Sequence, residues 1–393
     1  MYGGMDRRAL GVALVLSVTQ NAAYALIFLS YMNGYLLEEL RAGPSLPGYS
    51  LALFSGVVFF ANPIAGRLLD TFAPRTVFAA ALALQLTAAL LLLLVPTIAG
   101  FLAATVFFAA GTGGAWPTFY AVLAHSLPES VRTRASGILA VAGYLATALG
   151  LTTGVFLLEA ETSVIAFGVL AGIISVSAPV MFSGPFMARE GHASDSAGGA
   201  PVASHNVGLF GAVLFGYCAV SAALAGEYGP YLIDSQDVSI AEAVPFMVPA
   251  GLTALLALLA VTAVHSDRTR PRNVAILFGV AALGAAGVAM AGELWVSALA
   301  AIPLAAGVGG VGPLVGATLL DIGGASRRGG LLFGTFMSIE ALGAIAGPAV
   351  IATVVQFANP RYGMAAIALF LGLLVVAVAT APAHGPATAP VDD

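Results

Sequence analysis

Long stretches of apolar residues, separated by short polar or Gly/Pro-rich breaks, follow one another along almost the whole chain. Each stretch is about as long as the roughly 20 residues that an α-helix needs to cross a membrane. Twelve such stretches are found, over residues 9–37, 48–68, 76–95, 98–124, 136–158, 163–187, 207–233, 240–264, 273–292, 294–320, 331–357 and 362–382. Strands of a membrane β-barrel alternate apolar and polar residues, whereas these stretches are continuously apolar. The pattern predicts an all-α integral membrane protein with twelve transmembrane helices.

The composition excludes the main soluble classes of protein. Of the 393 residues, 60% are hydrophobic and only 8% are charged, against about 25% charged residues in soluble domains. A soluble enzyme, a nucleic-acid-binding protein and a disordered chain are therefore excluded, and a lipid bilayer is the expected surrounding. Cys218 is the only cysteine, so no intrachain disulfide can form. Because no catalytic, nucleotide-binding or metal-binding motif is found, we expect no cofactor, no metal and no enzymatic activity.

The distribution of arginines predicts the orientation in the membrane. If the N-terminus is cytoplasmic and every span crosses, 12 of the 14 basic residues fall inside, and only Arg41 and Arg361 fall outside. This is the asymmetry that the positive-inside rule describes. We therefore expect a multi-pass protein of the cytoplasmic membrane with both termini on the cytoplasmic side.

The two halves of the chain repeat each other at an offset of about half its length. Asp70–Val77 matches Asp267–Val274, and Gly111–Pro117 matches Gly307–Pro313. A parallel repeat of six spans implies a pseudo-twofold axis along the membrane normal. The predicted organisation is two pseudo-symmetric six-helix bundles joined by a cytoplasmic linker, with the boundaries 1–187, 188–206 and 207–393.

With twelve spans, two halves and a central cytoplasmic loop, the chain resembles the major facilitator superfamily of secondary transporters. The most specific match is the family's loop between the second and third helices, written G-x-L-x-D-x-x-x-x-R. Its residues here are Gly66, Leu68, Asp70 and Arg75. The fold that the resemblance implies is two six-helix bundles around a substrate pathway.

The same loop recurs in degenerate form in the second half, where Asp267 and Arg272 are kept and Ala263 replaces the glycine. The resemblance implies that Gly66, Asp70, Arg75 and these two residues form a conformational lock between the halves. Asp70 could cap a helix N-terminus and pair with an arginine. The alternative is plain positive-inside anchoring with an incidental aspartate.

Two departures from the family bear on function. Phe107 stands where proton-coupled members often carry an arginine, and Leu151 follows Gly150 where drug/proton antiporters usually show Gly-Pro. Both departures count against a standard proton-driven drug exporter.

Two glutamates in the apolar stretches are candidates for proton or cation coupling. Glu340 lies near the middle of the eleventh stretch, and Glu227 lies near the outer end of the seventh. An ionisable side chain within a membrane must face a cavity, a partner or a proton. The alternatives are a neutral Glu340 bonded to a neighbouring helix and a Glu227 that reaches water.

Polar and aromatic residues at symmetric positions of the two halves predict a central substrate pathway. The candidate pathway residues are Gln20, Asn21, Tyr24, Trp116, Tyr120, Tyr144, Tyr217 and Ser221. The alternative is hydrogen bonding between helices and an aromatic belt at the membrane surface.

Together these patterns predict a secondary active transporter that moves a small organic solute by alternating access, through a rocker-switch motion. Proton-coupled uptake or exchange is the leading form, with a proton or ion as co-transported partner. Two alternatives stay open, a multidrug/proton antiporter and a membrane sensor that does not transport. We expect a monomer that binds no nucleic acid.

Overall fold

The structure is a computed structural model that describes residues 7–32, 35–42, 46–128, 131–159, 163–183, 204–236, 240–264, 270–325 and 329–380. Every regular element within these ranges is helical. The elements are α1 (Arg7–Tyr24), η1 (Ala25–Tyr31), η2 (Tyr35–Glu39), α3 (Leu46–Thr71), α4 (Pro74–Leu94), α5 (Ile98–Ser126), α6 (Arg132–Glu159), α7 (Ser163–Val176), η4 (Ala178–Phe182), α9 (Ser204–Gln236), α10 (Ile240–Val264), α11 (Arg270–Met290), α12 (Leu294–Ala325), α13 (Gly329–Phe357) and α14 (Pro360–Ala379). Asp267 and most of the predicted linker, residues 188–203, lie outside the described ranges.

Twelve of the helices in the described ranges are long and apolar enough to cross a membrane, which confirms the all-α prediction with twelve spans. Their outward faces carry large apolar side chains that are mostly exposed, such as Leu283 at 75%, Leu369 at 69% and Leu94 at 71%. Such faces suit contact with lipid tails rather than with water. The chain is therefore a multi-pass membrane protein.

The first span changes its helical form part of the way along. The α1 helix continues into η1, which is π-helical over Ala25–Tyr31. Within η1 the Ser30 hydroxyl donates to the carbonyl oxygens of Ala25, at 3.1 Å, and Leu26, at 2.9 Å. A π-helical turn closes with an i→i+5 hydrogen bond and so holds more residues than an α-helical turn. The π-helical segment therefore helps to explain why this apolar run is longer than one straight α-helical span.

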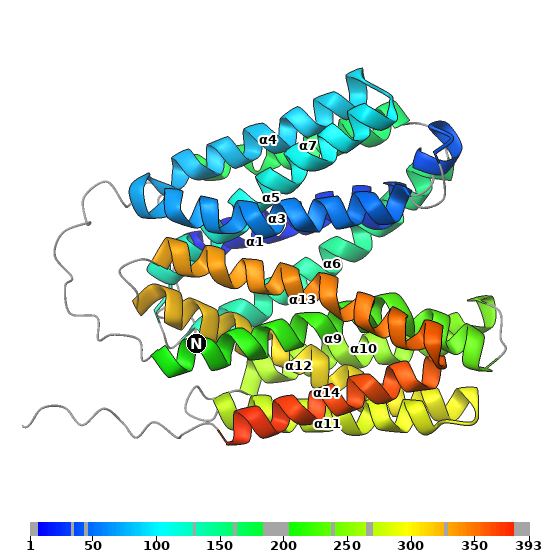
Figure 1. The fold of residues 1–393 in the computed structure, drawn as a ribbon. Helices are drawn as coiled ribbons and strands as arrows, with labels where there is room; N and C mark the ends of the chain where they lie inside the picture. Colours follow the sequence, from blue (N-terminus) through cyan, green and yellow to red (C-terminus); the bar gives the residue numbers. More distant parts are fainter. Residues whose placement is uncertain are drawn as a thin grey trace, which may run out of the picture.

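The helices form two bundles that lie one above the other in Figure 1. In the first bundle α4 and α3 pack on α5, and α1 packs on α6. In the second bundle α13 packs on α9, and α12 packs on both α10 and α11. The bundles meet mainly where α3 contacts α13 and where α6 contacts α10 and α12.

Glycines at repeat-related positions have the same packing role in both bundles. A Cβ atom on Gly111 would lie 2.6 Å from the Ala81 carbonyl oxygen, so a side chain there would force α5 away from α4. In the second bundle Gly307 of α12 lies equally close to Ala281 of α11, where a Cβ would be 2.7 Å from the alanine methyl carbon. Small residues let membrane helices approach closely and gain dispersion energy, which explains the repeated glycines physically.

Most arginines lie at one end of the molecule, where α4, α6 and α11 begin. We call this the arginine-rich end, and its described members include Arg67, Arg75, Arg132, Arg134, Arg270 and Arg272. Arg41 and Arg361 lie at the opposite end. In Figure 1 the helices α3 and α13 lie close together at the end where α13 begins, and they diverge toward the other end.

Candidate functional site: a cavity between the bundles and its closed end

A cavity of about 330 Å³ lies between the two bundles and is lined by both of them. It has the size of a small-molecule site, because ligand pockets run from about 300 to 1,000 Å³. Its polar, aromatic and sulfur-bearing lining residues are Ser17, Asn21, Trp116, Phe119, Tyr120, Ser136, Tyr144, Thr147, Tyr217, Cys218, Met337 and Glu340. The site is therefore completed within one chain, at the interface of its two halves.

Aromatic rings form much of the cavity wall. Trp116 contacts Phe119 edge to face, with ring centroids 5.4 Å apart, and both lie on α5. Tyr120 stacks on Phe333 of the second bundle at a centroid distance of 6.3 Å. Tyr144 and Tyr217 come from opposite bundles and interact through their hydroxyl groups. These rings give the wall both apolar faces and polar edges.

Glu340 is the one acid among the described lining residues, and none of those residues is Arg, Lys or His. It lies on α13, close enough to Tyr120, Tyr217 and Cys218 for electrostatic interaction. None of these three neighbours carries a positive charge. A carboxyl group in this position must bind a proton or a cation to be stable in a low-dielectric interior.

Two small polar side chains of α1 form hydrogen bonds within the first bundle at the cavity wall. Ser17 Oγ donates to the Leu139 carbonyl oxygen of α6 at 3.1 Å, and Asn21 Nδ2 donates to the Ser17 carbonyl oxygen at 2.8 Å. Gly143 makes this arrangement possible, because a Cβ there would lie 3.0 Å from Asn21 Nδ2. The side-chain amide of Asn21 also carries an oxygen that can accept a hydrogen bond.

Six of the residues predicted from the sequence meet in this cavity, and four lie elsewhere or are not described. Gln20 is buried in the first bundle and exchanges hydrogen bonds with Gln85, at 3.1 and 2.7 Å. Tyr24 packs on Phe54 with centroids 5.2 Å apart. Ser221 is not among the lining residues, and of Glu227 only the helical backbone is described. The six in the cavity are Asn21, Trp116, Tyr120, Tyr144, Tyr217 and Glu340.

At the arginine-rich end α3 and α13 cross with their backbones in contact. A Cβ on Gly330 would lie 2.5 Å from the Gly66 carbonyl oxygen and 2.8 Å from Asp70 Oδ1. One turn further along α13, Gly334 contacts the backbone of Asn62. Ser338 Oγ then donates to the Phe59 carbonyl oxygen at 2.7 Å. Only very small residues fit between the two helices here.

Asp70 caps a helix of the other bundle. Its two carboxylate oxygens accept hydrogen bonds from the backbone N–H groups of Gly330, at 3.0 Å, and Leu331, at 3.2 Å. These groups belong to the first turn of α13, which has no partners for them within the helix. The negative charge of Asp70 also complements the positive end of the α13 dipole. Asp70 thus stabilises contact between the bundles at this end.

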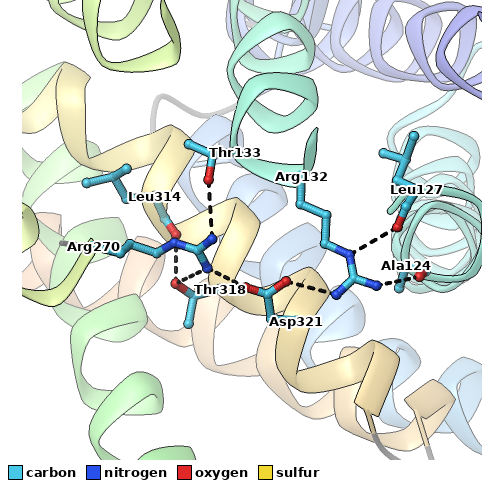
Figure 2. A network of polar contacts seen from close by, with 8 residues as sticks. All are labelled: Ala124, Leu127, Arg132, Thr133, Arg270, Leu314, Thr318 and Asp321. Atoms are coloured by element: carbon cyan, nitrogen blue, oxygen red, sulfur yellow. Dashed lines mark hydrogen bonds and ion pairs between the residues drawn. The ribbon is translucent and has the colours of Figure 1, made fainter. Parts of the chain in front are cut away.

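A second cross-bundle contact is an ion network on Asp321 of α12 (Figure 2). Arg132 Nη1 of the first bundle donates to Asp321 Oδ1 at 2.8 Å, and Arg270 Nη1 of the second donates to Oδ2 at 2.5 Å. Arg270 Nη2 also reaches Thr133 Oγ1 of the first bundle, at 3.3 Å. Both arginines are nearly buried, with 8% and 10% of their side chains exposed.

Arg132 also completes the C-terminal end of α5. Its Nη2 donates to the Ala124 carbonyl oxygen at 2.9 Å, and its Nε donates to that of Leu127 at 3.3 Å. The last carbonyls of a helix have no partners within it and form the negative end of its dipole. One guanidinium therefore connects α5, α6 and α12 (Figure 2).

The sequence interpretation did not single out Asp321, because it lies one residue beyond the predicted span 294–320. The available signal was an acid at the end of a span whose neighbouring loops are rich in arginine. Phe119, Ser17 and Met337 also went unnoticed, because residues of these types are common on buried helix faces.

A membrane protein with two helical bundles, a cavity between them and polar contacts that close one end has the architecture of a transporter. The chain belongs to the Major Facilitator Superfamily, whose family model matches residues 10–348. This confirms the family that the loop at Gly66–Arg75 indicated.

Solved transporter structures show the same fold at low sequence identity. The human organic anion transporter MFSD10 (TETRAN) is 18% identical, with a TM-score of 0.78 and coverage of 95% of this chain and 99% of that one. The fucose transporter FucP in its outward conformation is 15% identical, with a TM-score of 0.74 and coverage of 95% and 99%. A bacterial homologue of the iron transporter ferroportin, in an outward-facing state, is 12% identical, with a TM-score of 0.68 and coverage of 94% and 99%. A search among curated proteins finds no match to this sequence.

Proposed function

We propose that the protein is a secondary active transporter that carries a small organic solute across the cytoplasmic membrane by alternating access. The observation that carries this proposal is the position of the cavity between the bundles, next to contacts that join the bundles at the arginine-rich end. Breaking those contacts and closing the opposite end would expose the same cavity to the other side of the membrane. The cavity is complete within one chain, so we expect the protein to act as a monomer.

Glu340 is the proposed coupling site for a proton. The titratable groups that interact with it are Tyr120 from α5 and Tyr217 and Cys218 from α9, and Tyr144 from α6 lines the same cavity. At neutral pH the ordinary form of each of these groups is uncharged. Protonation of Glu340 therefore removes an uncompensated charge from the membrane interior. If the group takes a proton on one side and releases it on the other, the two fluxes are coupled.

A multidrug/proton antiporter is the second candidate function, and the sequence offers it less support. Phe107, which occupies the place of a proton-coupling arginine, is 37% exposed and does not line the cavity. Leu151 likewise lies outside the cavity wall. We therefore prefer the proposal in which the intramembrane acid Glu340 couples transport to the proton.

Transport by purified protein in proteoliposomes tests the proposal against a sensor that does not transport. A solute that raises the melting temperature of the protein in a thermal-shift screen is added, and its movement into the vesicles is followed with a pH gradient and without one. Saturable entry that accelerates with the gradient supports a coupled transporter. A solute that binds tightly but never crosses the membrane would support the sensor instead.

We propose that the arginine-rich end faces the cytoplasm, in keeping with the positive-inside rule. The closed contacts of Asp70 and Asp321 would then lie on the cytoplasmic side, and the structure would represent an outward-facing state. Two of the solved relatives, FucP and the ferroportin homologue, are also in outward states.

Labelling of single cysteines tests this orientation. Because Cys218 is the only native cysteine, Cys218→Ser provides a background without thiols. In that background we expect Ser196→Cys, in the predicted linker, to react with a membrane-impermeant maleimide only after the cells are permeabilised. Glu293→Cys, at the exposed turn between α11 and α12, is the matched control and should react in intact cells. The reverse pattern would invert the proposed topology.

Asp70→Asn should shift the protein away from the state that is closed at the arginine-rich end. The substitution keeps the shape of the side chain but removes its charge from the first turn of α13. A charge at a helix N-terminus contributes from about 0.3 to 2 kcal/mol, depending on burial. We therefore expect the closed population to fall about twofold to thirtyfold relative to the open one.

Distances between spin labels at Thr71 and Ala263, which belong to opposite bundles and are exposed at this end, measure that population. Solute affinity of the state that remains closed should stay unchanged, because Asp70 is not a lining residue. Glu293→Gln, an exposed acid at the far end, is the control and should leave the distances unaltered. Loss of binding with unchanged distances would contradict a role as a lock.

A further inference from the structure

The ionisable side chains that line the cavity favour one sign of charge in a ligand. Among its described lining residues there is one carboxyl group, that of Glu340, and no basic side chain. An anionic solute would find no Arg or Lys to neutralise it, and its charge would be repelled by an ionised Glu340. A cationic solute would compensate the one carboxyl group among the described lining residues. The charge inventory therefore favours a cation over an anion.

The cavity wall also suits an organic cation more than a metal ion. No group of three or more His, Cys, Asp and Glu that could hold a metal is found among the described residues. The wall offers instead the rings of Trp116, Tyr120, Tyr144 and Tyr217 in the neighbourhood of Glu340. Aromatic faces attract ammonium groups, and most strongly where water is excluded. Rings combined with a single carboxylate are the chemistry that recognises alkylated or primary amines.

The remaining wall is apolar and supplies room for the body of such a solute. Phe119, Leu123, Leu139, Val315 and Leu319 line the cavity on the sides of α5, α6 and α12. A cavity of about 330 Å³ is at the small end of the range for ligand pockets. It accommodates a compact molecule with one charged group rather than a long amphiphile.

We propose that the cavity binds a small organic cation, with its ammonium group beside Glu340 between Tyr120 and Tyr217 and its apolar body against Phe119 and Leu319. This inference rests on the proposed function, in that the cavity is taken as the transport site. The cation and a proton then compete for the same carboxylate, so that binding weakens as Glu340 is protonated. The organic anions for which the human transporter MFSD10 is named therefore do not carry over to this chain.

Three matched probes test the proposal by equilibrium dialysis with the purified full chain. Benzyltrimethylammonium carries a fixed positive charge, benzyl alcohol is neutral and phenylacetate is an anion. We expect saturable binding of the cation, tighter than that of either other probe by about tenfold or more. Its binding should weaken at acidic pH, where a proton occupies Glu340. Phenylacetate that binds as tightly as the cation, or a cation that does not bind saturably up to about 10 mM, would overturn the proposal.

Trp116 locates the bound probe. The chain has two tryptophans, and Trp295 is 56% exposed away from the cavity. Trp295→Phe therefore leaves Trp116 as the only indole fluorophore. We expect its emission to change with the same saturation curve as the dialysis. Dialysis binding without any change of Trp116 emission would place the cation elsewhere and overturn the assignment of the site.

Glu340→Gln and Glu340→Asp separate charge from shape in this test. The Gln variant should bind benzyltrimethylammonium about tenfold more weakly or worse and lose the pH dependence, whereas the Asp variant should keep part of both. Glu293→Gln is the matched control and should bind like the parent. Cation binding that is unchanged in the Gln variant would refute the role of Glu340.

Failure of this inference is distinguishable from failure of the proposed function. If the pH gradient drives a neutral or anionic solute into proteoliposomes and the cation does not bind, transport stands and the substrate class is wrong. If the cation binds beside Trp116 but is never carried across the membrane, the ligand assignment stands and the transport function is wrong.

Discussion

Glu340→Gln is expected to abolish accumulation of solute driven by a pH gradient, while exchange of solute across the membrane continues. The amide keeps the shape of the carboxyl group and most of its hydrogen-bonding capacity but cannot take up or release a proton. In the parent, the group lies in a cavity with no basic lining residue among those described. Under the proposed coupling, a change of protonation there would let a proton gradient drive the cycle.

Proteoliposomes loaded with unlabelled solute and supplied with labelled solute outside measure exchange, and a pH jump without internal solute measures accumulation. We expect accumulation to fall to the level set by simple equilibration, with the exchange rate at saturating solute concentration reduced by less than about tenfold. Glu293→Gln serves as the matched control and should retain both activities. Accumulation that is like that of the parent, with the same pH dependence, would return Glu340 to a structural role.

Asp321→Asn is expected to have the largest effect on the conformational equilibrium. It removes the negative charge that lies between Arg132 and Arg270, both of which stay nearly buried. Removal of one partner from a buried ion pair costs about 3–5 kcal/mol. Because 34% of the Asp321 side chain is exposed, we expect about 3 kcal/mol, at the low end of that range. The state closed at the arginine-rich end should lose most of its population.

Label distances between Thr71 and Ala263 report this loss, and the melting temperature reports any general loss of stability. Adding Arg132→Gln to Asp321→Asn removes the cation that was left without its partner across the interface. The double variant should therefore be less perturbed than the sum of the two single variants, which is the mark of direct coupling. Additive effects of the two substitutions, or unchanged distances in Asp321→Asn, would show that the network does not hold the bundles together.

The fold was predictable from the sequence because a bilayer forces long, continuously apolar helices. The sequence repeat at Gly111 and Gly307 corresponds to a repeat in the structure, because each glycine allows the same close helix contact in its own bundle. Physical constraints on helix length and packing act on short stretches of chain. These constraints are therefore visible in the sequence, in single residues and their spacing.

The lining of the cavity was only partly predictable, as two adjacent residues show. Gln20 and Asn21 are equally polar, but Asn21 lines the cavity and Gln20 bonds to Gln85 inside the first bundle. Neighbouring residues of a helix point about 100° apart, so the rotation of α1 decides which one faces the cavity. That rotation depends on contacts with α4 and α6, which the sequence of α1 does not specify.

The network on Asp321 depends in the same way on tertiary structure. Its partners Arg132 and Arg270 lie 189 and 51 residues away along the chain. Each of the three resembles an ordinary charged residue at the end of a span. Only the docking of the two bundles gives them a shared role.

The glycine crossing of α3 and α13 has a consequence for the proposed motion of the bundles. Gly66, Gly330 and Gly334 bring the backbones of the two helices into direct contact, so these three positions contribute no interlocking side chains. Interlocked side chains would have to be withdrawn from their holes before the helices could part, and well-packed interfaces resist such gradual deformation. At this crossing the helices can roll over each other while a few hydrogen bonds are exchanged. If the protein cycles as proposed, we expect the helices to separate here with little rearrangement of side chains, so that the polar contacts around the crossing set the barrier.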